Sequence, residues 1–277
     1  MNSQALHSLG NAVGVIPAHL ESQRLPRKAL RPICGHPMIA WVYQRARSAR
    51  CLDRLVVATD SEEIFAYCRA NDLAVTMTSK AHRSGTERLA EVMMREGVSS
   101  AMGDLYVNIQ ADEPMITAEH IELLLRPFHD GTDAQVSTLK VAIGLEQARD
   151  PNNVKVVTDL EGRALYFSRT AIPSERGGEP DAFGRARYYK HLGIYAYTAA
   201  ALEKFRALQP SPLEQQEKLE QLRFLENGIP IVVVETYQDT IGVDTEEDLQ
   251  KVEEYFRQAG ITLDQRDRFA PPATSPR

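Results

Sequence analysis

Short apolar runs rich in β-branched residues alternate with longer amphipathic segments through the first half of the chain. This alternation is typical of a parallel sheet whose strands are joined by crossover helices. The predicted strands span residues 13–18, 55–59, 73–77 and 105–110. Helices are predicted between them: Pro37 opens the first, Ser61 caps the second, Thr86 starts the third, and Thr117 caps the fourth, which runs through Leu125.

The second half has a different pattern, in which strands follow one another with turns between them. Strands are predicted at 136–143, 154–159, 164–168, 188–197 and 231–235, with a hairpin connection at 159–162 and a polar loop at 174–187. A helix is predicted from Pro212 to Gly228, and another from Thr245 to about Phe256. The predicted fold class is therefore α/β, a mainly parallel twisted sheet flanked by helices, with an antiparallel strand insertion.

We divide the chain into an N-terminal extension at 1–12, one globular domain at 13–258 and a tail at 259–277. From Asp264 onward the tail is rich in Pro, Ser and Arg without apolar periodicity, so we expect disorder there. Length supports one large domain, because 277 residues with 43% apolar content can supply a full core. We expect a cytoplasmic protein, since no apolar run approaches the ~20 residues that cross a bilayer and the first residues lack a signal-peptide pattern.

Charge and cysteine content exclude several classes of protein. The formal net charge of −6 argues against a protein that coats nucleic acid. Any bound anion must therefore be neutralised by positive side chains close to it. Cys34, Cys51 and Cys68 are too far apart for a disulfide framework or a paired zinc-ligand spacing, and we interpret them as structural thiols. The Gly-rich phosphate loop and the Gly-x-Gly-x-x-Gly dinucleotide pattern are also absent.

The residues that follow each predicted strand carry the candidate chemistry, because ligands of open α/β sheets bind outside the carboxyl ends of the strands. The loop after the first strand contains Arg24, Arg27 and Lys28, which could hold triphosphate oxygens in place of backbone N–H groups. A solvated basic surface loop is an equally good interpretation of these residues alone.

Two carboxylates stand at comparable places. Asp112 follows the fourth strand with Glu113 beside it, and Asp244 lies between a short predicted strand and the last helix. Magnesium prefers one or two carboxylates together with phosphate oxygens and water, which suits an ion shared with a triphosphate. Each aspartate alone could instead be a turn residue or a helix cap.

The basic loop, the Gln-Ala-Asp-Glu-Pro turn at 110–114 and the Gly-Val-Asp-Thr turn at 242–245 occur in an order that resembles the 3-deoxy-manno-octulosonate (Kdo) cytidylyltransferases, also called CMP-Kdo synthetases. The similarity extends over residues 13–252 and includes further segments: Met77-Thr78, 84–88, 166–169, 191–195, 211–214 and 219–223. It implies a Rossmann-like nucleotidyltransferase fold and a homodimer. The implied reaction joins CMP from CTP to the anomeric hydroxyl of Kdo with release of pyrophosphate, as a step of lipopolysaccharide biosynthesis.

The resemblance also implies roles for individual residues. Arg24, Lys28 and Asp112 would be catalytic, with Asp112 and Asp244 binding Mg²⁺ as the cofactor. The CTP-binding residues would be Pro17, Ala18, His19, Met77, Thr78, Ser84, Gly85 and Thr86. The contacts to the sugar acid would be Gln110, Arg169, His191, Tyr195, Glu217 and Gln221. In-line attack on the α-phosphorus needs placement and charge neutralisation more than covalent help, which agrees with these roles.

The sequence departs from the family pattern at three positions near the predicted site. His19 stands where Arg is usual, and Arg27 and Ala111 stand where Gly is usual. These departures leave one alternative open, the same CTP chemistry on another acid, such as 8-amino-Kdo or a phosphonate like phosphonoformate. A second alternative is an inactive homologue that binds CTP as a sensor, against which the intact Asp112, Asp244 and Lys28 argue.

Overall fold

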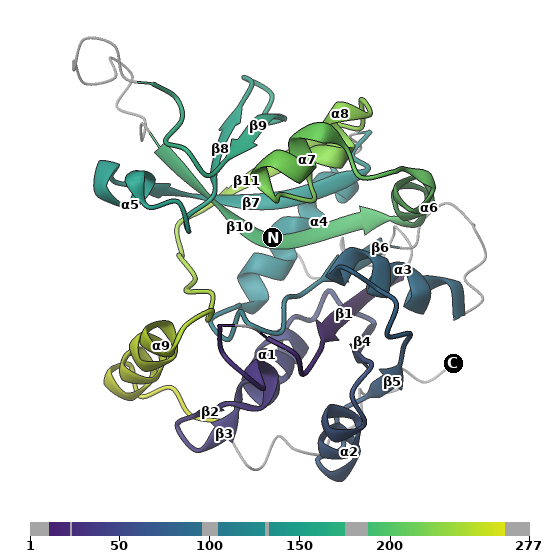
Figure 1. The fold of residues 1–277 in the computed structure, drawn as a ribbon, viewed down its shortest axis with the longest axis vertical. Helices are drawn as coiled ribbons and strands as arrows, with labels where there is room; N and C mark the ends of the chain where they lie inside the picture. The colour runs from purple at the N-terminus through teal and green to yellow at the C-terminus, as the bar shows by residue number, and fades with distance from the viewer. Residues whose placement is uncertain (1–10, 23, 96–104, 131–132, 175–187, 264–277) are drawn as a thin grey trace.

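A nine-stranded mixed sheet forms the centre of the computed structural model, which describes residues 11–22, 24–95, 105–130, 133–174 and 188–263 (Figure 1). Its strand order is β11-β7-β10-β6-β1-β4-β5, with β8 beside β10 and β9 beside β8. The strands are β1 Ala12–Ala18, β4 Arg54–Thr59, β5 Val75–Met77, β6 Leu105–Asn108, β7 Val136–Ile143, β8 Lys155–Thr158, β9 Ala164–Ser168, β10 Tyr188–Thr198 and β11 Ile231–Thr236. A separate two-stranded hairpin consists of β2 Pro32–Ile33 and β3 His36–Pro37.

The direction of the strands confirms the predicted fold class. β1 is parallel to β4 and to β6, β4 is parallel to β5, and β7 is parallel to β11. The long strand β10 runs antiparallel to both β6 and β7, and β8 pairs antiparallel with β9 through the hairpin connection predicted at 159–162. All seven residues of β1 are buried, as expected for a central strand covered on both faces.

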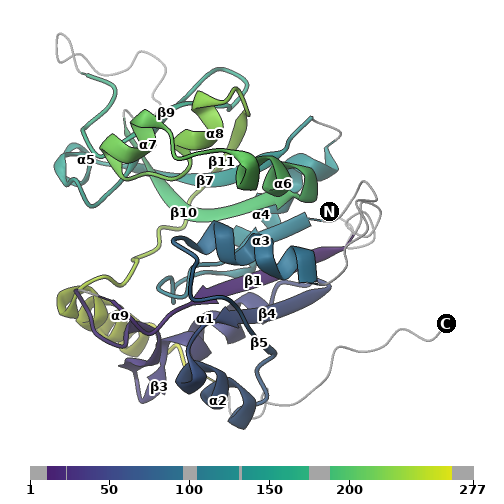
Figure 2. The ribbon, with the colours of Figure 1, turned by 45° about the vertical axis from the view of Figure 1, so that its right-hand side comes forward.

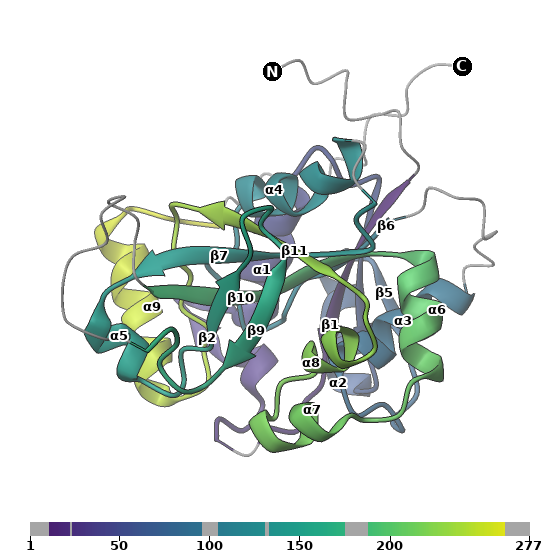
Figure 3. The same cartoon turned by 90° about the horizontal axis from the view of Figure 1, so that it is seen from above.

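Helices cover both faces of the sheet. The helical elements are η2 Lys28–Leu30, α1 Met38–Arg47, α2 Glu62–Ala70, α3 Gly85–Arg95, α4 Ala118–His129, α5 Leu145–Arg149, α6 Ala199–Ala207, α7 Pro212–Glu217, α8 Leu222–Glu226 and α9 Glu246–Gln258. Apolar side chains of α1, α2 and α4 share one core cluster with the sheet, and those of α3, α6 and α8 share another. Figure 3 shows α4 on one side of the strands and α6, α7 and α8 on the other.

A third, smaller core cluster attaches α9 to the first half of the molecule. Phe256 of α9 packs on Trp41 of α1 with ring centroids 4.6 Å apart, and the indole N–H of Trp41 donates to the carbonyl of Ile33 at 2.8 Å. Figure 2 shows α9 beside α1 and β3. Leu25, in the loop that follows β1, belongs to the same cluster, so α9 also lies next to this loop.

Several helix ends follow from their capping residues. Ser61 accepts a hydrogen bond from the N–H of Ile64 at 3.3 Å, and Thr117 accepts one from His120 at 3.2 Å, as predicted. At α9 the cap is Thr245, whose hydroxyl accepts from the N–H of Asp248 at 3.2 Å. The alternative that Asp244 caps this helix is therefore wrong, and its carboxylate is available for other contacts.

Some boundaries differ from the prediction. The helix predicted from Pro212 to Gly228 is two helices, α7 and α8, because Lys218 adopts a left-handed conformation with φ 56°. Helix α6 was not predicted, β5 begins at Val75 rather than at residue 73, and α4 continues past Leu125 to His129. The short strand predicted just before Asp244 is not present, since residues 237–243, all of them described, contain no strand.

The division into extension, domain and tail also needs adjustment. Ala12, placed in the extension, is the first residue of β1. Ile261 and Leu263, placed in the tail, pack against the third core cluster. The loop predicted at 174–187, apart from its first residue, and the tail from Asp264 lie outside the described residues. Within the described part of the chain, no helix has the length and apolar character that crossing a membrane requires.

The topology places a ligand site at one edge of the sheet. From β1 the chain proceeds to β4 and β5 on one side, and then returns to place β6 on the other side of β1. Because β1, β4, β5 and β6 are parallel, the loops after these strands meet at the same edge. Such a switch in strand order is where open α/β sheets bind their ligands.

Candidate active site

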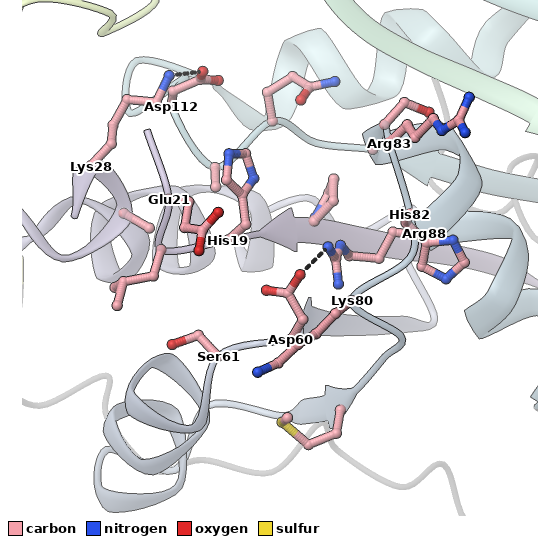
Figure 4. A pocket seen from close by; sticks show the side chains of 18 of the residues that line it. His19, Glu21, Lys28, Asp60, Ser61, Lys80, His82, Arg83, Arg88 and Asp112 are labelled. Atoms are coloured by element: carbon pink, nitrogen blue, oxygen red, sulfur yellow. Dashed lines mark hydrogen bonds and ion pairs between the residues drawn. The ribbon is translucent and has the colours of Figure 1, made fainter. Parts of the chain in front are cut away.

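A pocket with a volume of about 710 Å³ occupies this edge of the sheet (Figure 4). The segments that line it follow four neighbouring strands: His19 to Glu21 after β1, Asp60 to Glu63 after β4, Lys80 and 82–85 after β5, and Gln110 to Asp112 after β6. Pro17, Lys28, Ala29, Met77 and Arg88 complete the lining. A pocket of this size matches a small-molecule ligand.

Lys28 joins the two aspartates that the sequence singled out. Its Nζ donates to Asp112 Oδ2 at 2.5 Å and to Asp244 Oδ1 at 2.9 Å, and Arg24 Nη2 lies 2.8 Å from Asp244 Oδ2. The backbone reinforces this meeting, because the N–H of Val243 donates to the carbonyl of Asp112 at 2.8 Å. Two loops from distant parts of the chain are thus held together at the pocket edge.

The charges of this cluster support one another. Burial alone would lower the pKa of Lys28, but the charges and hydrogen bonds of Asp112 and Asp244 outweigh it and raise that pKa. Burial would raise the pKa of Asp244, whereas Lys28 and Arg24 lower it below its ordinary value. Lys28 and Asp244 therefore carry their charges at neutral pH.

The two aspartates fit a magnesium ion shared with a bound phosphate chain. Both carboxylates lie within hydrogen-bond distance of a single ammonium nitrogen, so one small cation can reach both of them. Among the described residues, no group of three or more His, Cys, Asp or Glu side chains gathers as a metal cage would require. Glu113 is a poorer ligand than its neighbour, because burial and the charge of Asp112 raise its pKa to about 7.

The turn at the start of α3 forms another wall of the pocket. Ser84, Gly85 and Met77 line it, whereas Thr78 and Thr86 are buried behind this wall. A Cβ atom at Gly85 would come within 3.0 Å of Pro17 Cγ, so glycine allows the turn to approach β1 closely. Ala18, also predicted to contact CTP, is buried within β1 and does not line the pocket.

The residues predicted to contact the sugar acid separate into two places. Gln110 lines the pocket, whereas the other five do not line it and belong to the second half of the chain. We call these five residues the acid-side cluster: Arg169, His191, Tyr195, Glu217 and Gln221. Glu217 accepts hydrogen bonds from Ser168 Oγ at 2.7 Å and from the N–H of Arg169 at 3.0 Å. The side chain of Arg169 donates to the carbonyls of Glu217 and Pro151.

His191 and Tyr195 lie on β10 with ring centroids 5.3 Å apart. Burial, with a smaller contribution from Lys190, lowers the pKa of His191 to about 3, so its imidazole is neutral and hydrogen-bonds to Thr138 at 3.0 Å. Tyr195 pairs with Asn108 across the β6–β10 ladder, and Asn108 lies two residues before Gln110 in the chain. The cluster therefore adjoins the pocket through this strand pair.

Three contributors to the site were given no role from the sequence. Asp60 follows β4 at the same edge as the predicted residues and pairs with the buried Arg88 of α3 at 2.7 Å. Its position after a strand could have revealed Asp60, and Arg88 lies within the similar segment 84–88 but was given no role. Glu220, between α7 and α8, hydrogen-bonds to Ser84 and Thr86 and thus connects the acid-side cluster to the pocket turn.

The three departures from the family pattern also lie at the pocket or its edge. His19 and Ala111 line it. Arg27 adopts φ 59° and ψ 31°, a left-handed conformation that costs a non-glycine residue roughly 1 kcal/mol, and its guanidinium pairs with Glu63 of the pocket lining. Arg27 therefore keeps the backbone shape that glycine adopts easily.

Fold and site together are those of a nucleotidyltransferase, and a family model described as "Cytidylyltransferase" matches residues 13–236. A 3-deoxy-manno-octulosonate cytidylyltransferase of Acidobacterium capsulatum is 51% identical over 88% of this chain and 96% of that protein. One of Koribacter versatilis is 50% identical over 89% of this chain and 90% of that protein. This chain belongs to the 3-deoxy-manno-octulosonate cytidylyltransferase family.

A solved structure agrees with this membership. It is described as CMP:2-keto-3-deoxy-manno-octonic acid synthetase complexed with CTP, and it superposes with a TM-score of 0.81 at 42% identity. The match covers 90% of this chain and all of that one. The fold of the described residues is therefore that of an enzyme which binds CTP.

Proposed function

We propose that this chain transfers CMP from CTP to the anomeric hydroxyl of Kdo, giving CMP-Kdo and pyrophosphate for lipopolysaccharide biosynthesis. The observation that carries the proposal is the gathering of Asp112 and Asp244 on Lys28 at the edge of the pocket. Relatives with about half of their residues identical over nearly the whole chain carry the name of this reaction, which supports the choice of acceptor.

In the proposed reaction, the acceptor hydroxyl attacks the α-phosphorus while the bond to the bridging oxygen of pyrophosphate breaks, and the hydroxyl proton is lost. Lys28 and Arg24 neutralise the triphosphate and then the departing pyrophosphate. Magnesium held by Asp112 and Asp244 would supply further charge neutralisation on the phosphates. The protein contributes placement and electrostatics rather than a covalent intermediate.

The acid-side cluster would orient the acceptor. Arg169 can exchange its two carbonyl partners for the substrate carboxylate, to which a guanidinium donates in parallel. His191 is neutral and therefore acts as a hydrogen-bonding group for sugar hydroxyls rather than as a cation. Tyr195, Gln110, Glu217 and Gln221 would complete this side.

The proposal includes magnesium as the cofactor, a homodimer as the assembly and the cytoplasm as the location. The carboxylate pair supports the cofactor, since magnesium in phosphoryl-transfer sites is held by one or two protein carboxylates together with the substrate. CTP is an intracellular nucleotide, which supports the location. The homodimer is proposed from the family resemblance.

Assaying pyrophosphate release with CTP and Mg²⁺, and with one acid at a time, tests this function. We expect turnover with Kdo, and a fall of at least ~100-fold in kcat/KM for Asp112→Asn because one metal-binding charge is lost. Asp133→Asn is the matched control, because this exposed aspartate precedes β7 at the opposite edge of the sheet and should leave turnover unchanged.

The same assay distinguishes the alternative acceptors. His19 in the pocket wall, at a position where the family usually carries arginine, motivates including 8-amino-Kdo and phosphonoformate. Turnover with either of them but not with Kdo would overturn the proposed acceptor and keep the CTP chemistry. Binding of CTP without turnover of any acid would indicate a sensor instead.

A further inference from the structure

The segment from Thr78 to Arg83 forms a wall of the nucleotide pocket without belonging to a strand or helix. Lys80, His82 and Arg83 line the pocket, and Figure 4 shows them along one side of it. Irregular backbone depends on contacts from its surroundings to keep one conformation. What holds this wall therefore affects how the pocket receives a nucleotide.

Glu91 of α3 binds the wall from behind. Its Oε2 accepts a hydrogen bond from the N–H of Ser79 at 2.9 Å and contacts Nε2 of His82, while Oε1 pairs with Arg95. The side chain is 16% exposed and does not line the pocket. Glu91 could be interpreted as a surface residue that only forms an i,i+4 ion pair with Arg95, worth ~0.3–0.5 kcal/mol. That interpretation does not explain its contacts with Ser79 and His82.

Neighbouring residues of α3 hold the rest of the same segment. Glu87 Oε2 accepts from the N–H of Arg83 at 2.8 Å. The buried Arg88 donates to Thr78 Oγ1 at 2.5 Å and to the carbonyl of Ser79 at 3.3 Å. Helix α3 thus holds both ends of the wall, at Thr78 and Ser79 and at Arg83, and Lys80 between these ends lines the pocket.

Glu91 keeps its charge at neutral pH in this arrangement. Partial burial alone would raise its pKa, but the N–H of Ser79, the contact with His82 and the charge of Arg95 lower it below its ordinary value. A charged acceptor makes hydrogen bonds about twice as strong as a neutral one does. The bond to Ser79 is therefore a charge-assisted attachment of this end of the wall.

We infer that Glu91 is a positioning residue for the nucleoside triphosphate, which it never touches, by fixing the pocket wall formed by Ser79 to Arg83. The inference rests on the proposed use of CTP but not on the identity of the acceptor. Loss of Glu91 releases the wall and weakens nucleotide binding, whereas the Lys28 cluster across the pocket remains in place.

The test measures equilibrium binding of CTP with Mg²⁺ by titration calorimetry, without any acceptor, and then steady-state kinetics. For Glu91→Ala we expect the CTP dissociation constant to rise ~10-fold, with kcat at saturating CTP within about twofold of wild type and an unchanged KM for the acid. Glu91→Gln retains an oxygen that accepts the Ser79 N–H, so it should restore most of the affinity.

Glu253→Ala is the matched control. Glu253 also lies on a helix, accepts a backbone hydrogen bond from a distant segment, Cys34 N–H at 3.1 Å, and pairs with an arginine four residues later, Arg257 at 2.9 Å. Its substitution should leave CTP binding unchanged.

An unchanged dissociation constant in Glu91→Ala would overturn the inference, and so would an equal rise in Glu253→Ala, since that would reflect general loosening. A fall in kcat with unaltered CTP binding would also overturn it. Because CTP binding is measured without an acceptor, this test of Glu91 remains valid even if Kdo is not the acceptor.

Discussion

His191 is an imidazole kept neutral inside the protein. It is buried between Phe167, whose ring centroid is 4.9 Å away, and Tyr195, and it hydrogen-bonds to Thr138. The neighbouring charge of Lys190 adds to the effect of burial, and the pKa falls from 6.5 to about 3. A group of this kind makes folding depend on pH.

The sign of that dependence follows from proton binding. Between pH 6.5 and pH 3 the unfolded chain binds a proton at this histidine that the folded chain does not bind. The contribution of His191 to the free energy of unfolding is therefore fully present above pH 6.5 and is lost as the pH falls toward 3. We expect His191→Asn to remove up to ~1.4 kcal/mol per pH unit from the slope of unfolding free energy in this range. Urea titrations at pH 7, 6, 5 and 4 measure it, and an identical slope in both proteins would refute the assignment.

At the scale of elements, Lys155 holds together the start of β8 and the end of β9. The residue is fully buried, and its ammonium donates to three backbone carbonyls, those of Asp150 at 2.9 Å, Asn153 at 2.5 Å and Arg169 at 2.6 Å. Burial lowers its pKa. Since one of the three carbonyls belongs to Arg169, the same attachment supports the acid side of the site.

Replacing Lys155 by Met keeps much of the side-chain volume and removes the donors. We expect a loss of about 2–3 kcal/mol in unfolding free energy because buried carbonyls lose their partners, together with a raised KM for the acid. Urea denaturation and kinetics measure the two effects. Lys204→Met, at a surface lysine that bonds to Gln135, should change neither, and equal behaviour of the two variants would contradict this role.

Local signals predicted most elements, and tertiary contacts decided the others. Ser61 and Thr117 were readable as caps because capping depends on neighbouring residues. The break between α7 and α8 could not be predicted in this way. The left-handed backbone of Lys218 is stabilised by contacts between the two helices, such as the pair between Arg223 and Glu214, nine residues apart. Thr198, which caps α6, was interpreted as lying beyond a strand, and the apolar positions of that helix were overlooked.

The site shows the same division. The convergence of Asp112 and Asp244 could be expected from their places after strands and from the resemblance. Nothing in the sequence indicates that Lys28 bonds to both, since this depends on how α9 packs on α1. Glu91 was missed because a charged residue on a helix ordinarily faces solvent, and Arg88, although inside the similar segment 84–88, was given no role for the same reason.

At the scale of the whole molecule, the proposed site extends over two halves of one sheet. The nucleotide pocket is formed by loops after β1, β4, β5 and β6, and the acid-side cluster belongs to β9, β10 and the α7–α8 region. The antiparallel strand β10 joins them by pairing with β6. Glu220 adds a direct connection to the turn at Ser84 and Thr86.

Because CTP would bind only the folded chain, it should stabilise the whole molecule. At a free concentration of about 100 times the dissociation constant, one bound ligand adds ~2.7 kcal/mol. For a chain of this size that corresponds to a rise in Tm of about 5 °C or more. Differential scanning calorimetry with CTP and Mg²⁺ measures it, and UTP at the same concentration should give a smaller shift. An unchanged Tm with CTP would argue against the pocket as the nucleotide site.

The most direct measurement follows the α-phosphorus itself. Wild-type protein is incubated with Kdo, Mg²⁺ and CTP labelled at the α-phosphate, and the products are separated. The proposed function predicts that the label appears in CMP-Kdo, that the pyrophosphate is unlabelled, and that Asp112→Asn abolishes the transfer. Failure of the label to join Kdo, although CTP binds and the protein is folded, would contradict it.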